Sequence, residues 1–107
     1  SNVKFRKKFT MRLSKMQIDK LSSYIGIAMQ GGNTIIGSDN LDGYTKKLYL
    51  VLVDKAAGKT SKKVFAKLQE RGIEGYEIDG LDEVIGKNIK IIAFKNKGLS
   101  EEIKKYL

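Results

Sequence analysis

The fold is decided by residues 47–53, which have the sequence KLYLVLV. In an extended conformation, successive side chains point to opposite faces, so this stretch is apolar on both faces. Such a pattern is typical of a central strand that is covered on both sides. Residues 88–94, NIKIIAF, predict another buried strand.

Helical segments alternate with these strands. Ser14 and Gln17 have the spacing of a capping box, and apolar residues then recur at helical spacing as far as Gly31. The other predicted strands are Thr34–Ile36 and Tyr76–Ile78, and the other predicted helices are capped by Ser38, by Thr60 or Ser61, by Asp79 and by Ser100. Strict alternation with short connections predicts an α/β fold with three layers, an α-β-α sandwich.

Composition excludes several classes of site. The 107 residues suffice for one core and contain no cysteine and no histidine, which excludes disulfides, Cys/His zinc sites and histidine-based triads. No nucleophile has a base beside it, so we expect no catalytic residue, no cofactor and no metal, and hence no enzyme. We find no apolar run long enough to span a membrane and no secretory signal, and therefore expect a cytoplasmic protein.

Charge points to a polyanionic partner. The chain has 21 basic and 12 acidic residues, a net charge of +9, and such an excess favours nucleic acid. Residues 1–12 hold five of the basic residues and no acid, so the remaining body has 16 basic against 12 acidic residues, a net +4. We therefore divide the chain into a basic arm, residues 1–13, and one domain, residues 14–107.

The arm has two interpretations. Apolar residues fall on alternate positions from Val3 to Leu13, and only Lys7 breaks the alternation. This pattern predicts a strand at a sheet edge, or one lent to a second subunit, which would give self-association. The other interpretation is a flexible tail.

A short motif, Gly58-Lys59-Thr60, follows the central strand. It has the setting of a phosphate-binding P-loop, but Val53 stands where that loop needs a glycine. A weaker form of the same chemistry remains, because helix N-termini and the lysines Lys59, Lys62 and Lys63 attract phosphate. The alternative is a solvated lysine face.

Two glycine turns are further candidates. The turns at residues 31–33 and 37–40 allow close approach of a ligand to the backbone, and their Asn, Ser and Asp side chains can bond bases or phosphates. The alternative is a turn followed by a helix cap, which the same residues serve well.

Several segments resemble, in order, the motifs of one family. Residues 25–37 (IGIAMQGGNTIIG) are similar to its IGLA-x-x-AGK-x-x-x-G segment, and residues 47–54 (KLYLVLVD) to its KLV-x-x-A-x-D strand. Residues 58–63 (GKTSKK), 81–87 (LDEVIGK) and 95–99 (KNKGL) resemble its lysine-rich helix start, its ELG-x-x-x-GK segment and its closing x-DKGF. The chain therefore resembles, from about residue 15 to 107, the kink-turn-binding ribosomal proteins of the L-seven-Ae and L-thirty-e group, including its small bacterial members.

The resemblance implies a four-stranded mixed sheet and a non-enzymatic, ribosomal-protein-like function in which loops at one end of the sandwich hold structured, kink-turn-like RNA. The RNA-binding residues that it implies, together with the lysines above, are Gly32, Asn33, Gly37, Ser38, Asp39, Asn40, Lys59, Ile78, Asp79 and Gly80. The chain departs from the family at Asn33 and Asn40, where lysine and glutamate are usual, and residues 38–46 form a shorter segment. One alternative is a protein-interaction module on the same fold that has lost specific RNA binding. Another is a phosphate-handling enzyme that uses Lys59 and Thr60.

Overall fold

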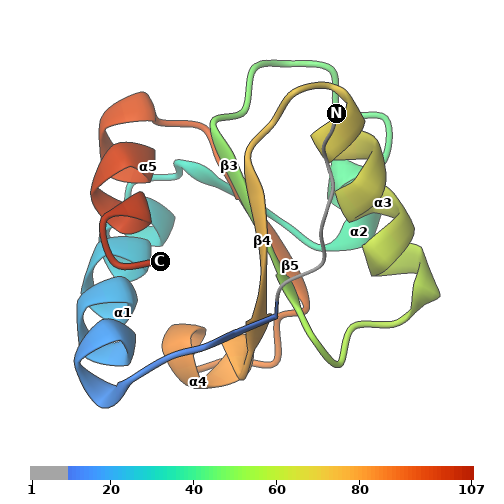
Figure 1. The fold of residues 1–107 in the computed structure, drawn as a ribbon. Coiled ribbons are helices and arrows are strands. Elements are labelled where there is room, and N and C mark those ends of the chain that lie inside the picture. Colours follow the sequence, from blue (N-terminus) through green and yellow to red (C-terminus); the bar gives the residue numbers. More distant parts are fainter. Residues whose placement is uncertain (1–9) are drawn as a thin grey trace.

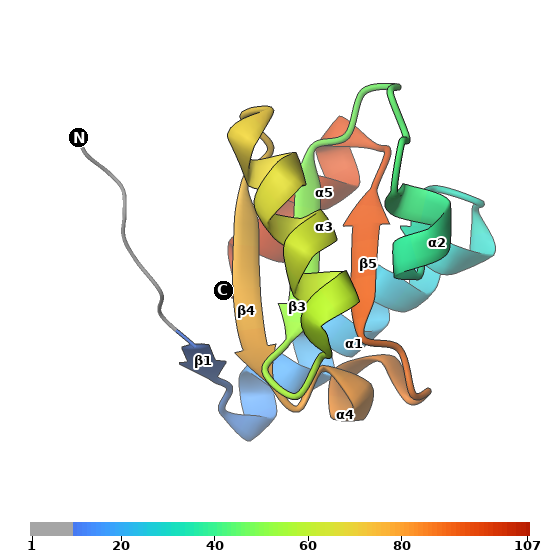
Figure 2. The ribbon, with the colours of Figure 1, turned by 90° about the vertical axis from the view of Figure 1, so that its right-hand side faces the viewer.

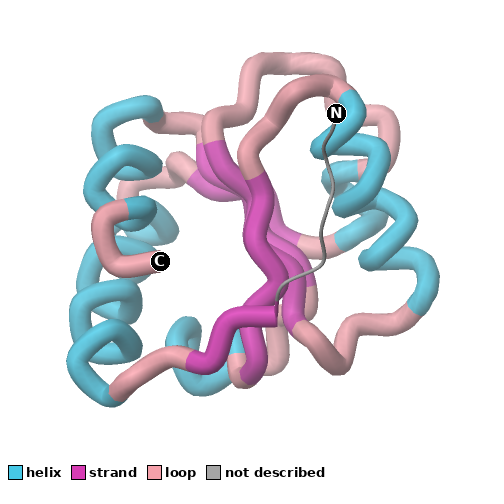
Figure 3. Tube along the Cα trace, in the orientation of Figure 1, coloured by secondary structure: helices cyan, strands magenta, loops and turns pink. Residues whose placement is uncertain are grey.

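The computed structural model describes residues 10–107, which form five strands and five helices (Figures 1 and 3). The strands are β1 (Thr10–Arg12), β2 (Thr34–Ile36), β3 (Leu50–Asp54), β4 (Gly75–Asp79) and β5 (Ile91–Phe94). The helices are α1 (Lys15–Gln30), α2 (Ser38–Leu41), α3 (Lys59–Glu70), α4 (Leu81–Ile85) and α5 (Lys97–Lys104). In this part of the chain, no helix is both long and apolar enough to cross a bilayer.

The strands form one mixed sheet in the order β1-β4-β3-β5-β2. Strands β1, β4 and β3 are parallel, whereas β5 is antiparallel to both of its neighbours. The expectation of four strands is therefore wrong, because residues 10–12 pair with residues 77–79 and add β1 to the sheet. The strand predicted in the arm is thus confirmed at Thr10–Arg12, while residues 3–9 lie outside the described residues.

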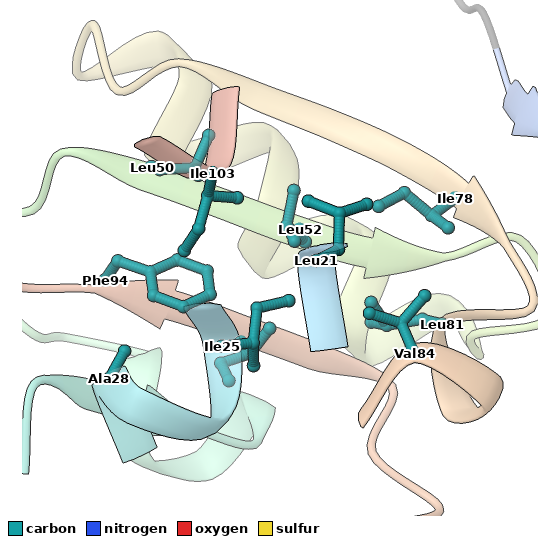
Figure 4. Packing of buried hydrophobic residues seen from close by; sticks show 11 residues of the cluster. Leu21, Ile25, Ala28, Leu50, Leu52, Ile78, Leu81, Val84, Phe94 and Ile103 are labelled. Carbon is teal, nitrogen blue, oxygen red and sulfur yellow. The ribbon is translucent and has the colours of Figure 1, made fainter. Parts of the chain in front are cut away.

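Helices cover both faces of the sheet, with α1, α4 and α5 on one face and α2 and α3 on the other (Figure 1). The alternation along β3 explains this arrangement. Leu50 and Leu52 lie in the cluster shared with α1, whereas Val51 and Val53 lie in the cluster shared with α3. Figure 4 shows the first cluster, in which Phe94 of β5 lies among side chains of α1 and α5. The four β3 residues and Phe94 are fully buried. Strand β3 is therefore the buried central strand that its sequence predicts.

The helix starts show which caps the sequence reveals. At α1 the capping box is confirmed: Ser14 Oγ accepts from the N–H of Gln17 at 3.2 Å, and Gln17 Oε1 accepts from the N–H of Ser14 at 2.9 Å. Helix α5 begins before the predicted cap, because Asn96 Oδ1 accepts from the N–H of Leu99 at 2.8 Å. Ser100 is fully buried, and its hydroxyl donates to the Asn96 carbonyl at 2.8 Å.

Three further helices begin after glycine. Gly37, and not Ser38, is the N-cap of α2; Gly58, and not Thr60 or Ser61, is the N-cap of α3; and Gly80, and not Asp79, is the N-cap of α4. Glycine offers no side chain to cap a helix, so the usual sequence signal for a cap is absent at these positions. Gly80 has a φ of 89°, a backbone conformation that residues other than glycine rarely adopt.

Candidate nucleic-acid interface

Strand direction brings separate segments to one edge of the sheet. Strands β2, β3 and β4 end at this edge, and antiparallel β5 begins there. The N–H of Gly37 donates to the Ile91 carbonyl at 3.1 Å, and the N–H of Asp54 donates to the Lys90 carbonyl at 2.8 Å. We call this side the loop edge and the opposite side the far edge. The loop edge comprises residues 37–40, 55–61, 79–83 and 86–90.

An open depression of about 330 Å³ lies on the loop edge. Its lining includes residues 37–40 around the start of α2, Ser61 of α3 and the segment Asn88–Lys90 before β5. Gly37 has a φ of 91°, which favours glycine and allows α2 to begin directly after β2. Three segments that are distant in the sequence therefore border one hollow.

The polar side chains of α2 differ in what they do there. Asp39 and Asn40 are exposed, and Ser38 is half-buried. The amide of Asn40 donates from Nδ2 to the Ile36 carbonyl at 2.8 Å, so this side chain stabilises the turn between β2 and α2. Hydroxyl and carboxylate groups such as those of Ser38 and Asp39 are suited to hydrogen bonds with nucleotides.

A buried carboxylate joins two segments of the loop edge. Asp54 is 3% exposed. Its Oδ1 accepts from the N–H of Ala56 at 3.1 Å, and its Oδ2 lies 3.4 Å from Nζ of Lys90. Asp54 thereby holds the loop after β3 against Lys90, the residue that precedes β5. In the sequence, Asp54 stands out only as the last residue of the segment 47–54.

The lysines at the start of α3 fall into two groups. Lys62 is half-buried; its ammonium donates to the Lys55 carbonyl at 2.8 Å and lies 3.7 Å from the Glu77 carboxylate. Lys59 and Lys63 are exposed, and within residues 10–107 neither makes an ion pair. Lys59 and Lys63 are therefore available to a ligand, whereas Lys62 is engaged within the protein.

Two of the predicted site residues lie elsewhere. Gly32 and Asn33 precede β2 and so lie at the far edge, where the Asn33 carbonyl accepts from the N–H of Lys95 at 2.8 Å. The four steps of extended chain from Asn33 to Gly37 span about 13 Å. The structure therefore does not bring the first glycine turn together with the second, and the expectation that both lie on one edge is not met.

The segment before α4 reaches the loop edge but contributes little side-chain surface. Ile78 is 0% exposed and lies in the core cluster on the α1 face. The Asp79 carboxylate lies 3.5 Å from the guanidinium of Arg12. Gly80 opens α4, which packs on the α1 face. None of these three residues lines the depression.

The segment Asn88–Lys90 lines the depression, although the sequence predicts a strand that begins at Asn88. The structure starts β5 at Ile91, which leaves Asn88 exposed and Ile89 and Lys90 half-buried along the depression. A signal was present in Gly86, whose φ of 79° ends α4 and which is followed by two polar residues.

Arg71 fixes the connection that leaves α2. Its guanidinium donates to the carbonyls of Tyr44, Thr45 and Lys46 at 2.6, 3.4 and 3.1 Å. The planar guanidinium suits such multiple donation. Arg71, at the end of α3, therefore holds residues 44–46 and helps to set the position of α2 relative to α3.

The perturbed pKa values lie near α5, away from the depression. Burial of Tyr76 and its hydrogen bond to Glu74 raise the pKa of Tyr76 to about 12. Burial alone would raise the pKa of Glu74, but hydrogen bonds from Tyr76 and Lys104 outweigh it, and this pKa is lowered. Lys104 lies 3.0 Å from Glu74 and 2.8 Å from Glu101. This cluster joins β4 to α5 and has a structural role.

The fold has counterparts among solved structures. A protein with unknown function from Bacillus halodurans is 24% identical, with a TM-score of 0.65, over 81% of this chain and 95% of that one. The Giardia lamblia 15.5kD RNA binding protein is 10% identical, with a TM-score of 0.61, over 87% of this chain and 86% of that one. At these identities the likeness shows a shared fold. No family model matches the chain, and no curated protein matches it.

Proposed function

We propose that this protein is a non-enzymatic RNA-binding protein that holds structured RNA at the loop edge. The observation that carries the proposal is the depression between α2, α3 and residues 88–90, beside which α3 presents the uncommitted Lys59 and Lys63. The net charge of +9 supplies attraction to a polyanion. The fold shared with the Giardia lamblia RNA-binding protein supports the same class of partner.

The proposed contacts divide by chemistry. Lys59 and Lys63 bind phosphates, which provides affinity without reading sequence. Ser38, Asp39 and Asn88 border the hollow and offer hydroxyl, carboxylate and amide groups to base edges or 2′-hydroxyls. An exposed carboxylate such as that of Asp39 repels phosphate but accepts from base N–H donors.

We further propose a sharply bent RNA of the kink-turn type, ribosomal or from another ribonucleoprotein, as the preferred partner. The resemblance of the sequence implies this class. A hollow bordered by three segments also fits it, because proteins recognise RNA most specifically at bulges and loops, where unstacked bases are accessible. An intact duplex presents no such base.

Binding to a fluorescent kink-turn hairpin, compared with a fully paired hairpin of equal length, tests the proposal. We expect tighter binding to the kink-turn hairpin and a steep loss of affinity as KCl increases. Ser38→Glu places a negative charge in the hollow at the first turn of α2, where acids are tolerated, and should weaken binding by about tenfold or more. Ser22→Glu, at an exposed position of α1, is the matched control.

The outcomes separate clearly. Equal affinity for the two hairpins would contradict the kink-turn preference. Absence of binding to either RNA at low salt would refute the function itself. If Ser38→Glu and Ser22→Glu weaken binding equally, the loop edge is not the interface.

A second candidate function, a protein-interaction module, is favoured by the position of β1. This strand is outermost in the described sheet and pairs with β4 on one of its two sides. A strand in this position can pair on its other side with a strand of a second copy. Sedimentation of the full chain over a wide concentration range tests this: a reversible dimer supports the module, and a monomer throughout contradicts it.

A further inference from the structure

The outer face of α3 carries a row of lysines that continues away from the loop edge. Lys59, Lys63 and Lys67 are spaced four residues apart, so successive positions rise by about 6 Å along the helix and lie on one side of it. All three are exposed. Lys62, one position away from this row, is instead directed to the Lys55 carbonyl and Glu77.

The lysine row borders a second open depression. Its lining comprises the three lysines of the row, Lys62, Thr60, Ala57, Val64 and Asp42 at the C-cap of α2. Residues of the first turn of α3 line both depressions, α2 lines the first and its C-cap the second, and Figure 2 shows these two helices on the same face of the molecule. A ligand that occupies the first depression can therefore extend along α3 without leaving the surface.

We propose that the lysine row binds consecutive phosphates of one strand of the RNA as it leaves the loop edge. This inference rests on the proposed RNA-binding function and names a second part of the same interface. The regular rise of the row matches a chain of evenly spaced anions. Lysine is a flexible point charge that contacts phosphate without selecting a base, so this contact is independent of sequence.

The surface favours RNA over an acidic protein segment. Cores of protein–protein interfaces are enriched in aromatic and other large apolar residues. Here the apolar lining consists of Ala57 and the buried Val64. The continuity with the loop edge also requires a ligand that is long and anionic along its whole length, which describes an RNA strand.

Asp42 limits the strength of this contact. Its carboxylate lies 3.6 Å from Nζ of Lys67, and both side chains are largely exposed, at 60% and 65%. Exposed ion pairs of this kind contribute little to stability. A phosphate near Lys67 must therefore displace or tolerate Asp42, and removal of this charge should strengthen RNA binding.

The salt dependence of RNA affinity tests the row. The probe is the kink-turn hairpin with one paired arm lengthened, and its Kd is measured by anisotropy at several KCl concentrations. The slope of log affinity against log salt is negative, and its magnitude should decrease by about 0.9 for each phosphate contact that is lost. We expect this decrease for Lys63→Ala and for Lys67→Ala, whereas Asp42→Asn should tighten binding. Lys95→Ala, at the far edge, is the matched control.

Lys62→Ala provides an internal contrast. Because Lys62 is engaged within the protein, its loss should lower the thermal midpoint and leave the salt slope unchanged. Lys63→Ala should instead leave the thermal midpoint unchanged and reduce the steepness of the salt dependence. The neighbouring positions thus separate a structural lysine from a ligand-binding one.

Three results would overturn the inference. If the wild type binds the hairpin but Lys63→Ala and Lys67→Ala both keep its slope, the row makes no phosphate contact, and RNA is held by the residues that line the first depression. If the wild type binds no RNA, the function and the row fail together. If poly-glutamate displaces the RNA arm at equal charge concentration, the row is a general anion surface and not an RNA track.

Discussion

Replacement of Asp54 by alanine tests how the loop edge is held together. Asp54 is 3% exposed, and its carboxylate accepts from the N–H of Ala56 at 3.1 Å and lies 3.4 Å from Nζ of Lys90. A hydrogen bond to a charged group contributes about 1.5–3 kcal/mol. The pair with Lys90 adds less than about 1 kcal/mol, because the lysine side chain is 38% exposed and solvent screens it.

Asp54→Ala should therefore lower the free energy of unfolding by about 2–3 kcal/mol. Asp54→Asn keeps an acceptor for the N–H of Ala56 and loses only the charge, so it should cost about 1 kcal/mol. For a chain of this size, 1 kcal/mol corresponds to about 4 °C in the thermal midpoint. We expect midpoints that are lower by about 8–12 °C for the alanine variant and by about 4 °C for the asparagine variant.

Thermal unfolding followed by circular dichroism measures both values, and hydrogen exchange reports where the loss occurs. Protection should decrease first in residues 55–58 and 88–90, the two segments that Asp54 joins. Two outcomes would refute the reasoning. One is an alanine variant as stable as the wild type, and the other is a loss of protection that is confined to the far edge.

Two further predictions concern the rest of the domain. Because the pKa of Tyr76 is raised to about 12 from its usual 10.0, the stability that its neutral form provides is complete below pH 10.0 and is lost as the pH rises towards about 12. Urea unfolding across this interval should show a smaller loss for Tyr76→Phe than for the wild type. A Cβ at Gly75 would lie 2.7 Å from the ring of Phe65, so Gly75→Ala should destabilise by about 1–3 kcal/mol. Gly26→Ala, with no neighbour within 4 Å, should stabilise α1 by about 0.5–1 kcal/mol, and equal thermal midpoints for these two variants would contradict the packing argument.

The sequence predicts the elements best where a local pattern and burial agree. The apolar stretch at residues 47–53 and the capping box at Ser14 both led to elements that the structure contains. Boundaries were less accurate where burial and pairing decide them. Leu48 and Tyr49 continue the apolar stretch towards the N-terminus, yet β3 begins at Leu50, opposite Phe94. Ser100 is of a residue type that often caps helices, but it lies inside α5, where it is buried.

The site was harder to predict, because its composition depends on pairing between distant strands. Gly32 and Gly37 are near neighbours in the sequence, but β2 lies between them and separates them by its whole length. Lys62 and Lys63 are adjacent and chemically identical, and they differ in that Lys62 meets the Lys55 carbonyl and Glu77 of β4. Neither fact leaves a local signal in the sequence.

The direction of β5 decides which charges an anionic ligand meets. Because β5 is antiparallel to β3, its first residues and Lys90 face the loop edge, and Lys95 lies at the far edge. A net charge of +9 indicates an anionic partner but gives no place for it. Strand direction provides the place, and the ion pairs then show which cations remain available. On the described surface of α3 these are Lys59 and Lys63, with Lys67 shared with Asp42. The salt slope of RNA binding should therefore follow these few lysines and not the total charge of the chain.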